Sequence, residues 1–401
     1  MTTVAQHVSE TNLPAEALTT ETLLERVHVL APTLRERAQE IEQHRCLPRD
    51  IVTSMREAGV FRMNMPRSWG GPELTSAQQI EVIEALAKAD ASVAWCAMIG
   101  ADSGIYSGYL PDEKAREMFP RLDMITAGWI HPEGVAERVA GGYRVSGRWR
   151  FGSGCTHADW LVAGCKVYSD GEPESDPRGN RSENWRIMVA RPEDFEILDT
   201  WHTTGLAGSG SRDYTVENLF VPEERSFSLD EPRRDGPLHA APDTILRKMA
   251  GVPLGVARAA IDYVRELAES RVDRATGDRW ADKGRVQNAV ATAEIQLSSA
   301  RAAVFDSVHQ QWEKLVSGTP QTAYERAAVA LARYNAFRVA RDIVNSLYDL
   351  VGGAAIYRTA SPLDRWLRDC TTMCQHAVGQ EQIVTSAGQL LLTGHSDSLF
   401  L

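Results

Sequence analysis

A histidine near the C-terminal end is the side chain in this sequence best suited to acid–base chemistry. His376 lies in the segment CQHAVGQEQIVTSAGQLLLTG, residues 374–394. An imidazole with an ordinary pKa of about 6.5 can accept or donate a proton near neutral pH. His131, in GWIHPEG, is a second candidate for acid–base chemistry at the same site. Packing or surface exposure is the alternative role for either side chain.

Two other segments carry residues that suit ligand binding. Trp149 and Phe151 are two residues apart in GGYRVSGRWRFGSGCTHADW (141–160), so we expect them on one face of a strand. Ser153 follows them and is either a ligand-binding hydroxyl or a turn residue. The segment TWHTTGLAGSGSRDYTVENLFVPEE (200–224) contains Gly205, Gly208, Ser209, Gly210 and Ser211. Its backbone N–H groups can approach a ligand closely, or the segment forms a tight turn.

Composition excludes several classes of protein. The chain has 401 residues, of which 43% are hydrophobic and 24% are charged, and its net charge is −11. An acidic chain of this kind does not suit nucleic acid, whose phosphates need a basic face. No apolar run approaches the ~20 residues of a membrane helix. The first twenty residues lack the features of a signal peptide, and the six cysteines lack zinc-site spacing. We therefore expect a cytoplasmic protein without a metal.

Periodicity divides the chain into three parts. Apolar residues recur at helical spacing in residues 1–123, where Pro48 and Gly59 mark the two ends of one helix and Thr75 or Ser76 caps another. Strand-like alternation with frequent turns follows in 124–228 and predicts a small β-barrel or sandwich. After a linker at 229–243, long Ala-rich helices in 243–401 predict a four-helix bundle. The fold class expected is α+β.

This order of elements resembles the acyl-CoA dehydrogenase superfamily across essentially the whole chain. The segments quoted above are similar to its flavin-facing strand and its glycine-rich loop, and YDLVGGAAIYRTASPLDRWLRDC (348–370) is similar to its Gly-Gly turn and its S-P-L-x-R-x-x-R-D signature. The resemblance implies a homotetramer in which a neighbouring subunit contributes the Gly-Gly turn to each flavin site. The cofactor-binding residues it implies are Trp149, Phe151, Ser153, Gly205, Gly208, Ser209, Ser211, Arg271, Gly352 and Gly353. Arg271 stands where the family binds a flavin phosphate, but the Phe-Gly-x-Pro that normally follows is missing, so Arg274 and Arg279 are rivals.

The choice between a carboxylate and an imidazole base separates two activities within this superfamily. Many acyl-CoA dehydrogenases carry a catalytic glutamate where this chain has Val378, and a valine cannot accept a proton. In the branch of two-component monooxygenases that hydroxylate phenols, indoles and steroid-derived phenols, a histidine follows the Arg-Asp signature at about the distance of His376. In that branch a serine matching Ser153 protects a flavin C4a-hydroperoxide. The resemblance therefore implies catalytic roles for His376 and Ser153. His131 is the second candidate for the acid–base role.

The expected function is hydroxylation of a small phenol- or indole-type substrate with O₂ and reduced flavin, either FADH₂ or FMNH₂. No G-x-G-x-x-G follows a predicted strand, so a separate NAD(P)H:flavin reductase is the expected partner. Three alternatives stay open. They are an acyl-CoA dehydrogenase or oxidase with its base elsewhere, an N-oxygenase of an amine or amino sugar, and a non-catalytic scaffold with the same fold.

Overall fold

Helices form the N-terminal part of the structure. The computed structural model describes residues 18–179, 182–273, 275–396, 398 and 401. As predicted, Pro48 and Gly59 flank one helix, with Gly59 in the left-handed conformation, and Thr75 caps the next through a capping box with Gln78. The helices are α1 (Thr20–Glu36), α2 (Ala38–His44), α3 (Arg49–Ala58), α4 (Ser76–Ala87), α5 (Ala91–Gly100), α6 (Ser103–Tyr106) and α7 (Asp112–Met118).

Among the described residues, the strands of the central region form an eight-stranded sheet, in the order β6-β7-β2-β1-β3-β5-β8 with β4 paired to β3. The strands are β1 (Thr126–Val139), β2 (Gly142–Gly152), β3 (Trp160–Ser169), β4 (Glu172–Pro173), β5 (Trp185–Ala190), β6 (Glu196–Leu198), β7 (Arg212–Pro222) and β8 (Ser226–Phe227). The β1–β3 pair is parallel, and the other pairs are antiparallel. Alternation in the sequence predicts the longer strands, whereas β4, β6 and β8 are too short to show a period.

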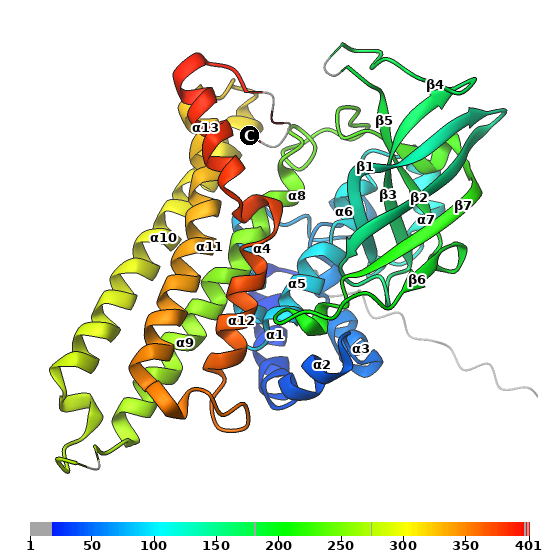
Figure 1. The fold of residues 1–401 in the computed structure, drawn as a ribbon. Coiled ribbons are helices and arrows are strands. Elements are labelled where there is room, and N and C mark those ends of the chain that lie inside the picture. The colour runs from blue at the N-terminus through cyan, green and yellow to red at the C-terminus, as the bar shows by residue number, and fades with distance from the viewer. Residues whose placement is uncertain (1–17, 180–181, 274, 397, 399–400) are drawn as a thin grey trace, which may run out of the picture.

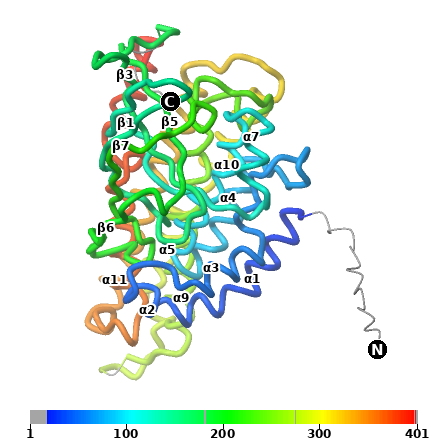
Figure 2. The backbone as a smooth tube through the Cα atoms, turned by 90° about the vertical axis from the view of Figure 1, so that its right-hand side faces the viewer, coloured from blue at the N-terminus to red at the C-terminus, as the bar shows by residue number. Residues whose placement is uncertain are grey.

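Long helices form the C-terminal part and stand beside the sheet (Figure 1). They are α8 (Thr244–Arg247), α9 (Gly251–Ser270), α10 (Gly284–Ser317), α11 (Ala323–Val351), α12 (Leu363–Met373) and α13 (Glu381–Thr393). In Figure 1 α5 lies between the bundle and the sheet, where it contacts both α9 and β1, and α4 packs along α9. Figure 2 views the same arrangement from the side of the sheet. The division into domains at 123, 228 and 243 stays a prediction. No helix in the described ranges is long and apolar enough to cross a membrane.

The glycine-rich loop before β7 is held against helices from both helical parts. A Cβ at Gly205 would lie 2.1 Å from the carbonyl oxygen of Arg368 on α12. A Cβ at Gly208 would lie 2.3 Å from the Ile41 side chain on α2. The space left by these missing side chains is therefore filled by the protein itself. A contact between either glycine and a flavin stays a prediction.

We expect Gly205→Ala to destabilise the fold, because the new methyl group meets backbone that cannot move aside. Overpacking of this kind costs about 1–3 kcal/mol in the free energy of unfolding. Gly284→Ala is the matched control, since a Cβ there meets nothing within 4 Å. Thermal unfolding of both variants checks the expectation. Equal melting temperatures for Gly205→Ala and the wild type would contradict it.

Candidate functional site

Three serine hydroxyls form a buried chain of hydrogen bonds between β2, β7 and α5. The Trp95 indole Nε1 donates to Ser153 Oγ over 3.0 Å. Ser153 Oγ lies 2.7 Å from Ser211 Oγ, which in turn lies 2.7 Å from Ser209 Oγ. Ser209 Oγ donates to the Leu206 carbonyl over 2.7 Å. Two of the predicted loop residues, Ser209 and Ser211, are thus brought together with Ser153.

The direction of these bonds follows from proton counting. A hydroxyl has one proton to donate. Ser209 gives its proton to the Leu206 carbonyl, so the bond between Ser211 and Ser209 uses the Ser211 proton, and Ser153 must donate to Ser211. Ser153 Oγ then has no proton left and can offer a further ligand only a lone pair. The site therefore presents a hydrogen-bond acceptor at this position.

His376 contacts the ring of Trp95, the residue whose indole N–H donates to Ser153. It precedes the short turn Ala377–Gly379, and its Nδ1 accepts a hydrogen bond of 3.3 Å from the Val378 N–H. Its ring lies 5.5 Å from the Trp95 ring in a T-shaped contact. Burial, aided by the positive charge of Arg333, lowers the pKa of His376 to about 4. The imidazole is therefore neutral at physiological pH, and with Nδ1 accepting, its proton lies on Nε2.

A partly exposed aromatic platform adjoins the serine chain. Phe151, with 46% of its surface exposed, has its ring 5.5 Å from Trp129 and 6.3 Å from Trp201. His131 is exposed, with its ring 6.5 Å from that of Trp129. The rings of Trp129 and Trp201 are tilted by 58° and 88° from the ring of Phe151, so the three form an uneven apolar patch, and the acceptor Ser153 follows Phe151 by two residues in the chain. This pairing suits a planar heteroaromatic ring.

The expectation that Trp149 and Phe151 share one face of a strand is wrong. Phe151 has a positive φ of 59°, and the β2–β7 register shifts between Trp149 and Gly152, so the alternation is broken there. Trp149 is fully buried, donates to the Gly164 carbonyl over 2.7 Å and stacks on Tyr214. Its ring therefore belongs to the core of the sheet and has no surface to offer a ligand in this structure.

The Arg-Asp signature joins the glycine-rich loop to α12. The buried Asp369 carboxylate accepts a 2.6 Å hydrogen bond from the Leu206 N–H. Burial, together with the charge of Asp90, raises the pKa of Asp369 to about 7. Arg368 donates to the Thr204 carbonyl and to the Glu42 carboxylate. These bonds fix the helix that leads to His376 relative to the loop that carries the serines.

The remaining predicted cofactor residues gather elsewhere. Arg271 ends α9, and its guanidinium lies 4.0 Å from the Trp280 ring and 3.5 Å from the Val351 carbonyl. Gly352 and Gly353 follow directly and are exposed. This group lies where α11 ends and before α12 begins, whereas His376 follows the other end of α12. Of its two rivals, Arg279 pairs with Asp282 on the surface, and Arg274 lies outside the described residues.

Trp95 and Asp369 are site residues whose roles the sequence did not reveal. Trp95 lies on α5, which is apolar on nearly all sides and therefore shows no face that points to a site. A buried indole N–H needs a hydrogen-bond acceptor, and this requirement is the feature of Trp95 that could have pointed to a polar partner in the fold. Asp369 belongs to the Arg-Asp signature, but its bonding partner, Leu206, is 163 residues away in the chain.

Comparison with known proteins decides the family. Two family models match, described as acyl-CoA dehydrogenase, N-terminal domain over residues 20–119 and acyl-CoA dehydrogenase, C-terminal domain over residues 248–381. Indole-3-acetate monooxygenase of Pseudomonas putida is 33% identical over 384 residues, which cover 94% of this chain and 95% of that protein. The chain belongs to the acyl-CoA dehydrogenase superfamily, in its flavin-dependent monooxygenase branch.

Other members of this monooxygenase branch also align with nearly the whole chain. The flavin-dependent monooxygenase oxygenase subunit HsaA of Rhodococcus jostii is 29% identical over 375 residues, 90% of this chain and 95% of that protein. The crystal structure of 3-HSA hydroxylase from Rhodococcus sp. RHA1 aligns with a TM-score of 0.86 at 25% identity, covering 95% of this chain and 99% of that one. At the position of the dehydrogenase glutamate, the structure has the buried side chain of Val378. At position 378 this chain therefore lacks the base that dehydrogenation would need.

His376 should remain neutral well below the ordinary histidine pKa, because protonation would place a poorly solvated positive charge, repelled by Arg333, on a partly buried ring. In protein labelled with ¹³C at histidine Cε1, the His376 resonance should stay unchanged between pH 8 and about 5.5. Its absence from the spectrum of His376→Gln assigns it. A titration midpoint near 6.5 would show that burial and Arg333 do not act as inferred.

Proposed function

We propose that this chain is an oxygenase component that hydroxylates an indole- or phenol-type substrate with O₂, using reduced flavin from a separate NAD(P)H:flavin reductase. The observation that carries the proposal is the arrangement of Ser153, Trp95 and His376 beside the aromatic platform. An acceptor, a buried indole and a neutral imidazole surround the place where a flat cofactor and an aromatic substrate would meet. Reduced flavin supplies the activation of O₂, and the protein supplies binding, orientation and exclusion of water.

The residues present fit a reduced flavin. The exposed ring of Phe151, with Trp129 and Trp201, offers an apolar face for the isoalloxazine. Ser153 Oγ, whose own proton is committed to Ser211, can accept a hydrogen bond from the N5–H that distinguishes reduced from oxidised flavin. Ser209 and Ser211 hold Ser153 in this orientation. We leave Trp149 out of the cofactor site because its ring is enclosed by the sheet.

His376 is the proposed acid–base residue. Its neutral imidazole carries a proton on Nε2 for donation to a hydroxyl or a departing oxygen, and it can accept a phenol or indole proton once Nδ1 releases the Val378 N–H. Trp95, packed between His376 and Ser153, keeps water out of the space that joins them. His131 is exposed at the platform and is the second candidate for this role.

The substrate and the assembly are proposed on further grounds. A relative with 33% identity is named for indole-3-acetate, so indole-type acids are the substrates to test first. We propose a cytoplasmic homotetramer without a bound metal. In this assembly a second copy covers the exposed Gly352–Gly353 turn and the adjacent side chains of Ile356 and Tyr357, which are 58% and 62% exposed. Arg271, next to this turn, would then serve the flavin phosphate of a neighbouring subunit, for FADH₂ or FMNH₂ alike.

Replacement of His376 tests the proposed role directly. His376→Ala should bind reduced flavin almost as well as the wild type, since the side chain does not belong to the aromatic platform. The rate of product formation should fall roughly 10²–10⁴-fold, the usual contribution of a positioned acid or base. Hydroxylated product per reduced flavin consumed is the measurement, with His28→Ala, an exposed histidine on α1, as the control. An unchanged ratio and rate would leave His376 as a packing residue.

Dependence on a reductase is a separate test. The purified chain should oxidise NADH or NADPH at a negligible rate with aromatic substrate and flavin present, and turnover should begin when a flavin reductase is added. Nicotinamide oxidation followed at 340 nm, alongside product analysis, checks this. Rapid turnover with nicotinamide and no reductase would refute the two-component assignment.

A further inference from the structure

A buried arginine interrupts the apolar face of α11. The residues along this face include Ala330, Phe337 and Ala340, which are nearly inaccessible, and Arg333 lies among them with 2% of its surface exposed. The helical spacing of three and four residues would place an apolar side chain at 333. Burying a guanidinium is costly unless it is paired and hydrogen-bonded, so its presence here requires a reason.

Arg333 has no hydrogen-bond partner among the residues that the structure describes. Its Nε and both Nη atoms are buried and unbonded. Two charged groups act on it, and together they leave its charge uncompensated. Asp243 attracts it, but one carboxylate oxygen of Asp243 is held by Arg247 and the other by Gln311. Arg247 itself repels Arg333, and burial lowers the pKa of Arg333 to about 10.

The position of Arg333 connects it to the proposed site. One turn further along α11, the Phe337 carbonyl accepts a hydrogen bond from Cys374 Sγ, two residues before His376, and Arg338 donates to the Gly379 carbonyl. Arg333 is also the charged group that acts on His376. Arg333, whose charge is shared with Arg247 against the single carboxylate of Asp243, therefore acts electrostatically on the residue proposed to handle the substrate proton.

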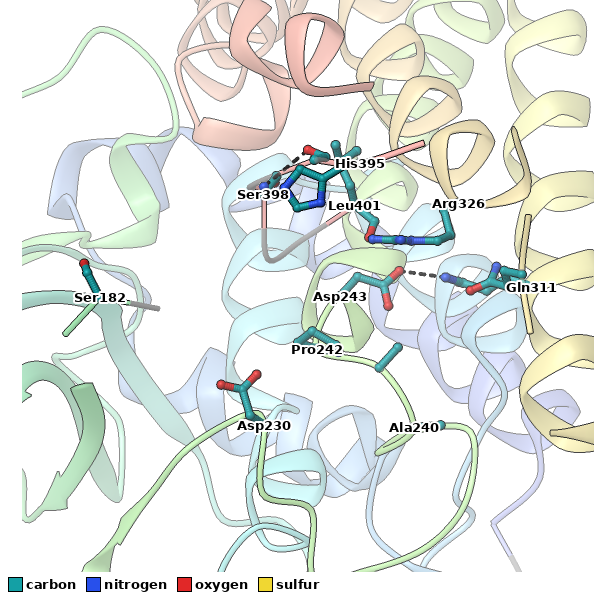
Figure 3. A pocket seen from close by; sticks show the side chains of 13 residues that line it. Ser182, Asp230, Ala240, Pro242, Asp243, Gln311, Arg326, His395, Ser398 and Leu401 are labelled. Atoms are coloured by element: carbon teal, nitrogen blue, oxygen red, sulfur yellow. Dashed lines mark hydrogen bonds between the residues drawn. The ribbon is translucent and has the colours of Figure 1, made fainter. Parts of the chain in front are cut away.

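An open pocket reaches the same region from outside. It has a volume of about 770 Å³, and Asp243, Gln311 and Arg326 line its inner wall, opposite Asp230 (Figure 3). Asp243 is thus shared between the pocket wall and the surroundings of Arg333. The pocket is large enough for a bicyclic aromatic molecule, and Arg333 does not line it.

We propose that Arg333 binds the carboxylate of the substrate, so that the enzyme acts on an aromatic acid whose ring extends from Arg333 toward His376 and the platform. A carboxylate can accept two parallel hydrogen bonds from a guanidinium, and it supplies the missing negative charge. Because the guanidinium is closed off in this structure, neighbouring side chains must move apart to admit the acid. This inference rests on the proposed function and specifies the class of its substrate.

The test compares an acid with its uncharged analogue. Indole-3-acetate and indole-3-acetamide are titrated by calorimetry into the full chain, with and without reduced flavin under argon, for the wild type, Arg333→Met and Arg333→Lys. Arg341→Met is the control, since Arg341 is on the same helix but pairs with its neighbour Asp342. Arg333→Met should weaken binding of the acid roughly 10²-fold and change binding of the amide by less than about threefold. Arg333→Lys should recover part of the loss.

Melting temperatures without ligand separate binding from a structural role. Arg333→Met removes an unpaired buried charge and should melt no lower than the wild type. A marked drop in its melting temperature would overturn the proposal, as would equal losses for acid and amide or equal affinity of the wild type for both. Hydroxylation of both probes with the same KM would refute the carboxylate site while the monooxygenase activity stands. Arg333-dependent binding of the acid without any hydroxylation would support the carboxylate site and contradict the proposed function.

Discussion

The backbone of Leu206 is the point on which the geometry of the site depends. Its N–H donates to the buried Asp369 carboxylate on α12, and its carbonyl accepts from Ser209 Oγ and from the Trp201 indole. Leu206 adopts a left-handed conformation, with φ at 49°, to make these bonds in opposite directions. One residue thereby fixes the end of the serine chain, one ring of the aromatic platform and the helix that leads to His376.

Helix α5 supplies the second constraint, because it fills the space between the sheet and α12. Trp95 reaches both sides, with its N–H on Ser153 and its ring against His376. A smaller side chain would leave room for water between the acceptor and the imidazole. Water there would weaken the electrostatic interactions that a buried site makes strong. The glycine-rich loop therefore orients the residues of the site, and α5 excludes water from between them.

The sequence predicts the fold better than the site, for physical reasons that particular residues show. The change of period near 124 and 243 reflects local burial, and caps such as Thr75 depend on neighbours three residues away. The site depends on contacts that no local pattern contains. Phe151 leaves the face of Trp149 because of a register shift set by β7, and Trp95 meets Ser153 only in the folded chain. The motif around Ser153 and the resemblance it carries make the serine a candidate, but they do not contain the bonds that commit its proton.

The charge of Arg333 links substrate binding to the state of His376. In the empty site two effects keep the imidazole neutral, namely burial and the nearby guanidinium. A carboxylate on Arg333 would cancel the second effect and leave the first, so the pKa of His376 would rise on binding, though not fully to that of an exposed histidine. The imidazole would then accept a proton most readily when an acid occupies the site. Free enzyme and complex would therefore differ in their readiness for proton transfer without any change in the position of the histidine. This coupling gives a reason for a chain to retain a buried charge that costs it stability.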